Sequence, residues 1–359
     1  MMRLLGQNRS TGRSTMAIPP SEAAAPPEHR NALLQLTTAV WAAQALWAAA
    51  RLGVADQLAA GPRSCEELAT ATGTLSRPLY RALRALAGLG IFQELPDGRL
   101  ANTPTSELLR SGVSGSLRDY VIFTGEPWHL AAHGEILHSL RTGRPSVDQV
   151  VGKNIWEFFA SDAEAGSRFH AGMTSLIEGE AALVRDGYDF RDVGTLVDVG
   201  GGHGALLGTI LAGQPGLRGI LFDQPSVIDG ARDTFERLGL RERVKIEGGD
   251  FFQGVPRGDA YLLSHIIHDW DDEQAIAILR SIRRASEPGA RLLLVEGVIP
   301  PGNEFHAGKL LDLEMLLLPG GIERTQAEYA ALLRAGGFRL RRVLPLPSAS
   351  SIVEGVAEG

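Results

Sequence analysis

The sequence reads Leu196-Val197-Asp198-Val199-Gly200-Gly201-Gly202-His203-Gly204 where an apolar run ends in a cluster of glycines. The apolar run predicts a buried strand, and a helix is expected to begin after the glycines. Glycines allow the backbone to turn tightly and to approach a ligand closely. The segment therefore predicts a strand, a ligand-binding turn and a helix, which is the start of an α/β domain.

A glycine turn after a strand serves dinucleotides, flavins or S-adenosylmethionine, so it does not identify the ligand by itself. Gly200 and Gly202 match the first pair of the dinucleotide fingerprint, and Ala205 is allowed by its looser form. Asp198 stands two residues before the first glycine. A carboxylate there suits the ammonium and sulfonium of S-adenosylmethionine and would repel a pyrophosphate. The alternative is that Asp198 only caps the following loop.

Two further acids follow the next two strand-like runs. Asp223 ends one of them, where an acid typically accepts hydrogen bonds from both hydroxyls of a ribose. Asp250 follows the next run and can accept from an adenine amino group, while Phe251 can stack on the ring. An Asp-Phe pair in a loop usually means nothing, but as the third of three strand-end elements in order it supports an adenosyl ligand.

Strand-like and helical runs alternate from about Asp192 onward. This order predicts βαβ units and hence a mostly parallel sheet with helices on both faces, a Rossmann-like domain over residues 189–359. The expected strands are Thr195 to Val199, Gly219 to Asp223, Val244 to Gly248, Ala260 to Ser264 and Arg291 to Glu296.

The N-terminal part predicts a second, mainly helical domain over residues 29–115. Ser64 with Glu67 is a capping box that starts one helix, and a second helix is expected from about Ser76 to Leu89. A hairpin turning at Pro96-Asp97-Gly98 completes a winged-helix pattern. The block Trp41 to Leu58 is apolar on several faces, which suits a helix buried between two surfaces, one of them from another subunit. Residues 116–188 are expected to add connecting helices that line the substrate pocket.

A winged helix also permits DNA binding. Arg77, Arg81 and Arg84 lie at helical spacing on the second helix, but the net charge of the chain is −7. Because phosphate neutralisation supplies most non-specific affinity, three arginines on an acidic chain make a DNA-binding regulator the weaker alternative.

Residues 1–28 predict a disordered tail. Arg3, Arg9 and Arg13 leave an organelle-targeting leader as an alternative, and Met16 is a possible start. The most apolar helical stretch, Ala39 to Val54, is interrupted by polar residues and is expected to fall short of a membrane span of roughly 20 residues. We therefore expect a cytoplasmic protein with neither a membrane nor a nucleic-acid partner. The chain's one cysteine, Cys65, excludes an intramolecular disulfide and a zinc site built on paired thiolates.

From about residue 31 to the C-terminus the chain resembles the small-molecule O-methyltransferases of the plant caffeate and acetylserotonin type and of bacterial antibiotic biosynthesis. The segments that carry the resemblance are Val197-Asp198-Val199-Gly200-Gly201-Gly202, Phe222-Asp223-Gln224-Pro225, Gly249-Asp250-Phe251-Phe252, His268-Asp269-Trp270-Asp271-Asp272 and Gly320-Gly321-Ile322-Glu323-Arg324-Thr325. It implies a homodimer built by the N-terminal domain, S-adenosylmethionine as methyl donor with S-adenosylhomocysteine as product, no metal, and an aromatic or quinone-like small-molecule acceptor.

The resemblance makes His268 the general base, flanked by the acids Glu296 and Glu323. A neutral imidazole is a workable base for a phenol at pH 7, and a base histidine needs an orienting partner on its other nitrogen. A packing role for His268 and a plain ion pair of Glu323 with Arg324 are the alternatives. A protein of this fold that keeps the cofactor but catalyses hydroxylation, decarboxylation or a pericyclic step is a further alternative, although such proteins tend to lose the histidine.

The remaining site residues are carried over from the resemblance. The expected cofactor contacts are Asp198, Gly200, Gly202, Asp223, Gln224, Asp250, Phe251, Ser264 and Trp270, and the expected substrate contacts are Phe169, Met173, Asp269 and Met315. Ser264 stands where many members have a lysine or arginine. No role is assigned to His203, nor to His265, which is expected to face away from Ser264.

Overall fold

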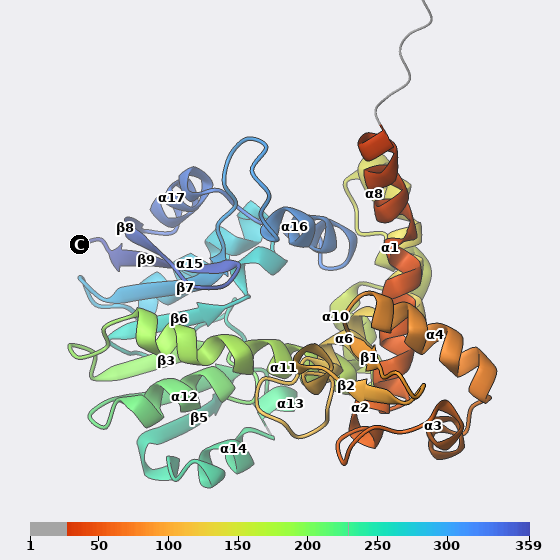
Figure 1. Cartoon of the computed structure of the whole chain (residues 1–359). Helices are drawn as coiled ribbons and strands as arrows, with labels where there is room; N and C mark the ends of the chain where they lie inside the picture. The colour runs from red at the N-terminus through yellow and green to blue at the C-terminus, as the bar shows by residue number, and fades with distance from the viewer. Residues whose placement is uncertain (1–26, 229) are drawn as a thin grey trace, which may run out of the picture. The chain divides into compact units, whose positions relative to one another are not determined.

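The computed structural model describes residues 27–228 and 230–359 (Figure 1). The tail expected over residues 1–28 lies almost entirely outside the described residues. The chain divides into a unit that ends at Ala42 and a larger unit from Ala43 to Gly359.

The first helix, α1 (Pro27–Arg51), is largely exposed in the single chain. Trp41 is 70% exposed and Leu36 is 76% exposed, whereas the buried residues of α1 are Ala49 and Ala50 near its end. Among the described residues, α1 is also the one helix long and apolar enough to span a membrane, by length and composition alone. This corrects the expectation that the polar residues within its apolar stretch leave it too short for a span. Only 6% of that apolar window is buried, so the single chain leaves it uncovered.

The next elements form the expected helix, helix and hairpin. Ser64 accepts the N–H of Glu67 while Glu67 accepts the N–H of Ser64. This capping box fixes the start of α3 (Cys65–Thr72), as predicted. The hairpin strands pair antiparallel. The elements are α2 (Val54–Gln57), α3 (Cys65–Thr72), α4 (Ser76–Gly88), β1 (Phe92–Glu94), β2 (Leu100–Asn102) and α5 (Pro104–Glu107).

A helical segment follows, as expected. Its last helix is long, and the side chain of Asp162 caps it by accepting the N–H groups of Glu164 and Ala165. The helices are α6 (Arg118–Thr124), α7 (Pro127–Gly134), α8 (Ile136–Thr142), α9 (Val147–Val151), α10 (Ile155–Ser161) and α11 (Ala163–Gly187).

The C-terminal domain is built on a seven-stranded sheet of order β5-β4-β3-β6-β7-β9-β8 (Figure 1). The five predicted strands are present and pair in parallel. Two strands at the C-terminus, absent from the sequence-based prediction, pair antiparallel at one edge. The strands are β3 (Thr195–Val199), β4 (Arg218–Asp223), β5 (Val244–Gly248), β6 (Ala260–Ser264), β7 (Arg291–Gly297), β8 (Phe338–Pro345) and β9 (Ser350–Ala357).

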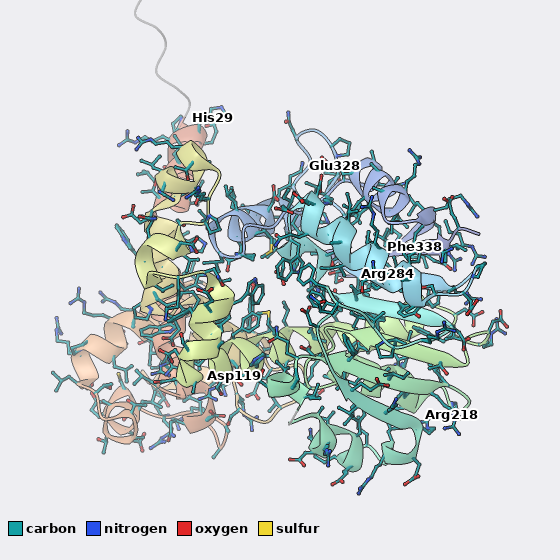
Figure 2. All side chains as sticks on the ribbon, turned by 180° about the vertical axis from the view of Figure 1, so that it is seen from behind. His29, Asp119, Arg218, Arg284, Glu328 and Phe338 are labelled. Carbon is teal, nitrogen blue, oxygen red and sulfur yellow. The ribbon has the colours of Figure 1, made fainter. Side chains whose placement is uncertain are left out.

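Side chains that alternate along the strands build a core on each face of the sheet. Leu196 and Leu262 join the core beneath α11, α12 and α14, while Val197 and Leu263 join the core beneath α15 and α17. Arg284 and Glu328 mark α15 and α17 in Figure 2. The helices of this domain are α12 (Ala205–Gly213), α13 (Pro225–Ile228), α14 (Ala231–Arg237), α15 (Asp272–Ala285), α16 (Gly308–Leu317) and α17 (Gln326–Ala335).

This topology determines where the polar residues gather. The carboxyl ends of β3 to β7 meet at one edge of the sheet, and open α/β sheets bind their ligands there. The turns and strand ends at this edge carry Gly200, Asp223, Asp250, His268 and Glu296.

Candidate active site

The glycine turn after β3 has backbone angles that favour glycine. Gly200 and Gly202 have φ of 73° and 58°, in the left-handed region that side chains rarely adopt. A Cβ placed on Gly202 would meet nothing within 4 Å. The turn is held by the N–H of Gly202, which donates to Oδ2 of Asp223 at 2.8 Å. Open space above a fixed glycine turn allows a ligand to lie against the backbone.

Asp198 lies at the end of β3 with only 1% of its surface exposed. Its Oδ2 has no hydrogen-bond partner among the described residues. Burial, and secondly the nearby carboxylate of Asp223, raise the pKa of Asp198 to about 7. A buried acid without a partner is unfavourable unless a cationic group meets it, so Asp198 fits the charged end of S-adenosylmethionine.

Asp223 holds the turn from the neighbouring strand. Its Oδ1 accepts the N–H of Gln224 at 2.6 Å, and burial raises its pKa in spite of the two backbone N–H groups that it accepts. The side chain of Gln224 is exposed. The position of Asp223 beside the glycine turn fits the ribose contact that the sequence predicts.

Aromatic rings line the next part of the edge. Asp250 accepts the N–H of Phe252 at 2.9 Å, which fixes the loop after β5. The ring of Trp270 lies edge-on to Phe251 and Phe252, at centroid distances of 6.0 and 5.0 Å, and stacks on Trp156 at 5.9 Å. These rings provide flat apolar walls of the kind that hold an adenine. Ser264 ends β6 at the same edge of the sheet, and its buried Oγ has no partner among the residues described.

His268 is a buried histidine that the structure places between two buried acids. Its Nδ1 lies 2.6 Å from Oε1 of Glu323 and 3.6 Å from Oε2 of Glu296. Glu296 is held in turn by the N–H groups of Ile266 and Ile267, which donate to its Oε1. The three residues predicted to form the catalytic group are therefore adjacent, with Glu323 closest to the histidine.

The other ring nitrogen of His268 faces Asp269. Oδ1 of Asp269 lies 3.6 Å from Nε2, too far for a direct hydrogen bond. Burial raises the pKa of Asp269 to about 7 and that of Glu323 to about 7, and it also raises the pKa of Glu296. With Nδ1 engaged by Glu323, Nε2 is the nitrogen left for a substrate proton.

His265 lies closer to this group than the sequence predicts. It follows β6 with φ of 53°, which breaks the strand alternation, and its ring centroid lies 5.3 Å from that of His268. Nε2 of His265 contacts Oε2 of Glu180 on α11 at 2.9 Å. Burial alone lowers the pKa of His265, but Glu180 outweighs this and raises it to about 9. No sequence pattern pointed to Glu180, which lies 85 residues away from His265.

Three of the four expected substrate residues lie on two helices, while Asp269 follows β6 beside His268. Phe169 and Met173 lie one turn apart on α11, and the ring of Phe169 stacks on Phe159 at 4.5 Å. The ring of Phe169 also lies edge-on to that of Phe123, with 5.7 Å between the ring centroids. Met315 is buried on α16. The aromatic rings around Phe169 offer apolar faces suited to a flat apolar acceptor.

Comparison with known proteins agrees with this geometry. Residues 133–339 match the O-methyltransferase domain family, and residues 34–112 match the O-methyltransferase dimerisation domain. Together the two matches extend from α1 to the start of β8. The second match covers the winged-helix-like segment, which favours subunit contact over DNA binding there.

Curated relatives span nearly the whole chain. The phenazine O-methyltransferase of Lysobacter antibioticus is 43% identical over 90% of this chain and 94% of its own length. The mitomycin biosynthesis 6-O-methyltransferase of Streptomyces lavendulae is 40% identical, with coverage of 90% and 92%. The phenazine-1-carboxylate N-methyltransferase of Pseudomonas aeruginosa is 35% identical, with coverage of 89% and 95%.

Solved structures agree in fold and in cofactor. The crystal structure of LaPhzM superposes with a TM-score of 0.87 at 42% identity, over 92% of this chain and 99% of that one. An O-methyltransferase of neocarzinostatin biosynthesis, solved with S-adenosylmethionine and 2-hydroxy-5-methyl naphthoic acid, has a TM-score of 0.74 at 34% identity, with coverage of 88% and 95%. The chain therefore belongs to the S-adenosylmethionine-dependent O-methyltransferase family that carries an N-terminal dimerisation domain.

Proposed function

We propose that this S-adenosylmethionine-dependent methyltransferase methylates a hydroxyl group of an aromatic or quinone-like small molecule in natural-product biosynthesis, with His268 as general base. The contact of 2.6 Å between Nδ1 of His268 and Oε1 of Glu323 carries this proposal. It leaves Nε2 as the proton acceptor and places a negative charge behind the ring.

The residues at the sheet edge would hold the cofactor. Asp198 meets its charged end, Asp223 its ribose, and Asp250 with Phe251 its adenine, while Ser264 and Trp270 border the same space. When bound, S-adenosylmethionine supplies a methyl group that is already activated by the sulfonium. The chain therefore has to orient the acceptor and remove its proton.

Proton removal is the task of His268. The acceptor hydroxyl loses its proton to Nε2, and the ring becomes an imidazolium. Glu323, supported by Glu296, stabilises the imidazolium because its carboxylate lies against the Nδ1–H. Burial of all three side chains strengthens this interaction by excluding water.

The substrate class follows from the walls. The cluster of Phe123, Phe159 and Phe169 is apolar and flat, and Met173 and Met315 add adaptable apolar contacts. The relatives named above act on phenazine and mitomycin compounds, and the neocarzinostatin enzyme was solved with a naphthoic acid. These similarities support a polycyclic aromatic or quinone-like acceptor.

Methylation of nitrogen is the second candidate. One relative that spans this chain is an N-methyltransferase. An aromatic amine releases its proton after attack, so it depends less on a base than a phenol does. Strong dependence on His268 is therefore the expected mark of an oxygen acceptor.

The assembly is part of the same proposal. The match to the dimerisation domain supports a homodimer, and the apolar, exposed residues of α1 support its use in that contact. We place the protein in the cytoplasm, as expected from the sequence, and its match to the O-methyltransferase family supports this.

The test is a screen of purified protein with S-adenosylmethionine against matched pairs of acceptors that differ only in carrying a hydroxyl or an amine, such as naphthols and naphthylamines. We expect products that gain one methyl group on oxygen, detected by mass spectrometry. Methylation confined to the amines would establish the second candidate. Conversion without a gain of a methyl group would point to non-methylating chemistry on the same fold.

A further inference from the structure

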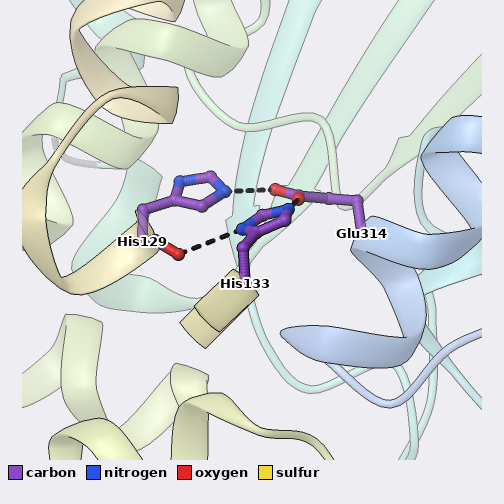
Figure 3. Close-up of side chains that lie close together, drawn as sticks. All are labelled: His129, His133 and Glu314. Atoms are coloured by element: carbon purple, nitrogen blue, oxygen red, sulfur yellow. Dashed lines mark hydrogen bonds and ion pairs between the residues drawn. The ribbon is translucent and has the colours of Figure 1, made fainter. Parts of the chain in front are cut away.

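Two histidines and a glutamate meet between α7 and α16, outside the residues assigned to the cofactor and to catalysis (Figure 3). His129 and His133 are four residues apart on α7, so both side chains lie on one face of that helix. Glu314 reaches them from α16. Its Oε1 lies 2.7 Å from Nε2 of His129, and its Oε2 lies 3.0 Å from Nε2 of His133.

The second nitrogen of each ring is also engaged. Nδ1 of His129 lies 3.3 Å from the carbonyl oxygen of Phe123, and Nδ1 of His133 lies 3.0 Å from that of His129. A carbonyl oxygen only accepts, so each Nδ1 carries the proton. Metal-binding histidines are commonly fixed this way, because the backbone acceptor orients the ring and leaves Nε2 for the ion.

The three side chains converge on one point. His129 is only 1% exposed, and its Nε2 and the Nε2 of His133 both contact the single carboxylate of Glu314. One divalent cation placed there can bond to all three groups at once.

We propose that Nε2 of His129, Nε2 of His133 and the carboxylate of Glu314 form a binding site for a divalent transition metal ion, with Zn²⁺ as the best match. Two imidazoles and one carboxylate are a common zinc ligand set, and three protein ligands leave one position for water. The side chains of His133 and Glu314 are 43% and 20% exposed, which gives the ion a path from solvent.

The geometry needs little adjustment. The three donor atoms lie within 4.8 Å of one another. Zinc–ligand distances of about 2.0–2.2 Å in a tetrahedral site separate the donors by about 3.3 Å. When an ion enters, the contacts of 2.7 and 3.0 Å would lengthen towards this value, and any donor pair spaced more widely would close towards it.

A metal here would fix α16 to α7. On the same helix, Asp312 accepts the N–H of Glu323, the residue that contacts His268, and Met315 follows Glu314 directly. The ion would be a structural link that supports the substrate wall. It is distinct in its residues from the second histidine-containing group with metal-like spacing, which consists of His265, His268 and Glu296 and belongs to the catalytic site.

The experiment is a titration of full-length, chelator-treated protein with Zn²⁺ by calorimetry and with Co²⁺ by visible absorption. We expect one tight equivalent per chain, a Co²⁺ spectrum typical of four or five ligands, and a rise in Tm with Zn²⁺. His133→Ala and Glu314→Gln each weaken binding by about tenfold or more and abolish the rise in Tm.

Matched controls keep the outcome clear. His138→Ala, on the neighbouring helix α8, and His268→Ala, in the catalytic group, retain the tight equivalent. Circular dichroism of each metal-free variant shows whether it folds, and the half-exposed His133 tolerates alanine best. Absence of a tight equivalent, binding unaffected by both cluster variants, or loss of binding in His268→Ala alone would each overturn the proposal.

Discussion

Oε1 of Glu323 lies 2.6 Å from Nδ1 of His268, whereas the nearer oxygen of Glu296 lies 3.6 Å from the same nitrogen. The family resemblance implies only that both acids flank His268. The distances indicate that the two have different roles. Glu323 contacts the proposed base, His268, directly. Glu296 accepts two backbone N–H groups and so fixes the turn that carries His268.

Glu323→Gln should lower kcat by about 10²-fold or more, because the amide cannot stabilise the imidazolium by charge. The affinity for S-adenosylmethionine should remain unchanged. Glu304→Gln, on an exposed loop, is the control. An unchanged kcat in Glu323→Gln would remove Glu323 from the mechanism. Arg324 does not offer it another role, because that side chain pairs with Asp272.

The strands of the sheet were predictable because each is a short apolar run between turn residues. β3, β5 and β6 begin and end where the sequence predicts. The strands β8 and β9 were missed. In β8 basic residues at 339, 341 and 342 obscure the apolar positions, and two arginines there are neutralised by Glu354 on β9.

Contacts between residues far apart in the chain could not be predicted from the sequence. His265 meets Glu180 because its positive φ turns the chain after β6, which strand alternation does not foresee. Glu314 meets two histidines of α7, although the spacing of His129 and His133 was itself visible. Trp41, expected to be buried partly by another subunit, is exposed in the single chain.

Asp198→Asn should make the unliganded protein more stable at pH 8 and weaken cofactor binding. Burial raises the folded pKa of Asp198 to about 7 from a usual value near 4, so its contribution to stability is present below about pH 4 and is lost as the pH rises through about 7. Asparagine cannot ionise and removes this loss, which amounts to roughly 1–4 kcal/mol at pH 8.

Urea unfolding of the wild type and Asp198→Asn at pH 5 and pH 8 measures this difference. The two free energies of unfolding should diverge as the pH rises, in favour of the variant. Calorimetry should show tighter binding of S-adenosylmethionine by the wild type as the pH rises through about 7, with no such trend in the variant. Equal pH dependence of both proteins would mean that Asp198 is not the group that meets the cation.

Leu36→Glu together with Trp41→Glu should convert the homodimer to monomers. Both side chains are apolar and more than two thirds exposed in the single chain, and two charges desolvated at a subunit contact oppose association. Light scattering after size-exclusion chromatography measures the mass. Arg51→Glu, at the end of the same helix, is the charge-changing control. A double variant that stays dimeric would place the contact on another surface of the domain.

The measurement that bears most directly on the mechanism compares His268→Ala and Asp223→Ala in two assays, calorimetric titration with S-adenosylmethionine and turnover of an acceptor found by screening. We predict that His268→Ala binds the cofactor as the wild type does but loses about 10²–10⁴-fold in kcat, as removal of a general base does. Asp223→Ala should lose binding, because its carboxylate holds the glycine turn and is the group proposed to bind the ribose. If His268→Ala retained wild-type turnover of a hydroxyl acceptor, His268 would not be the base.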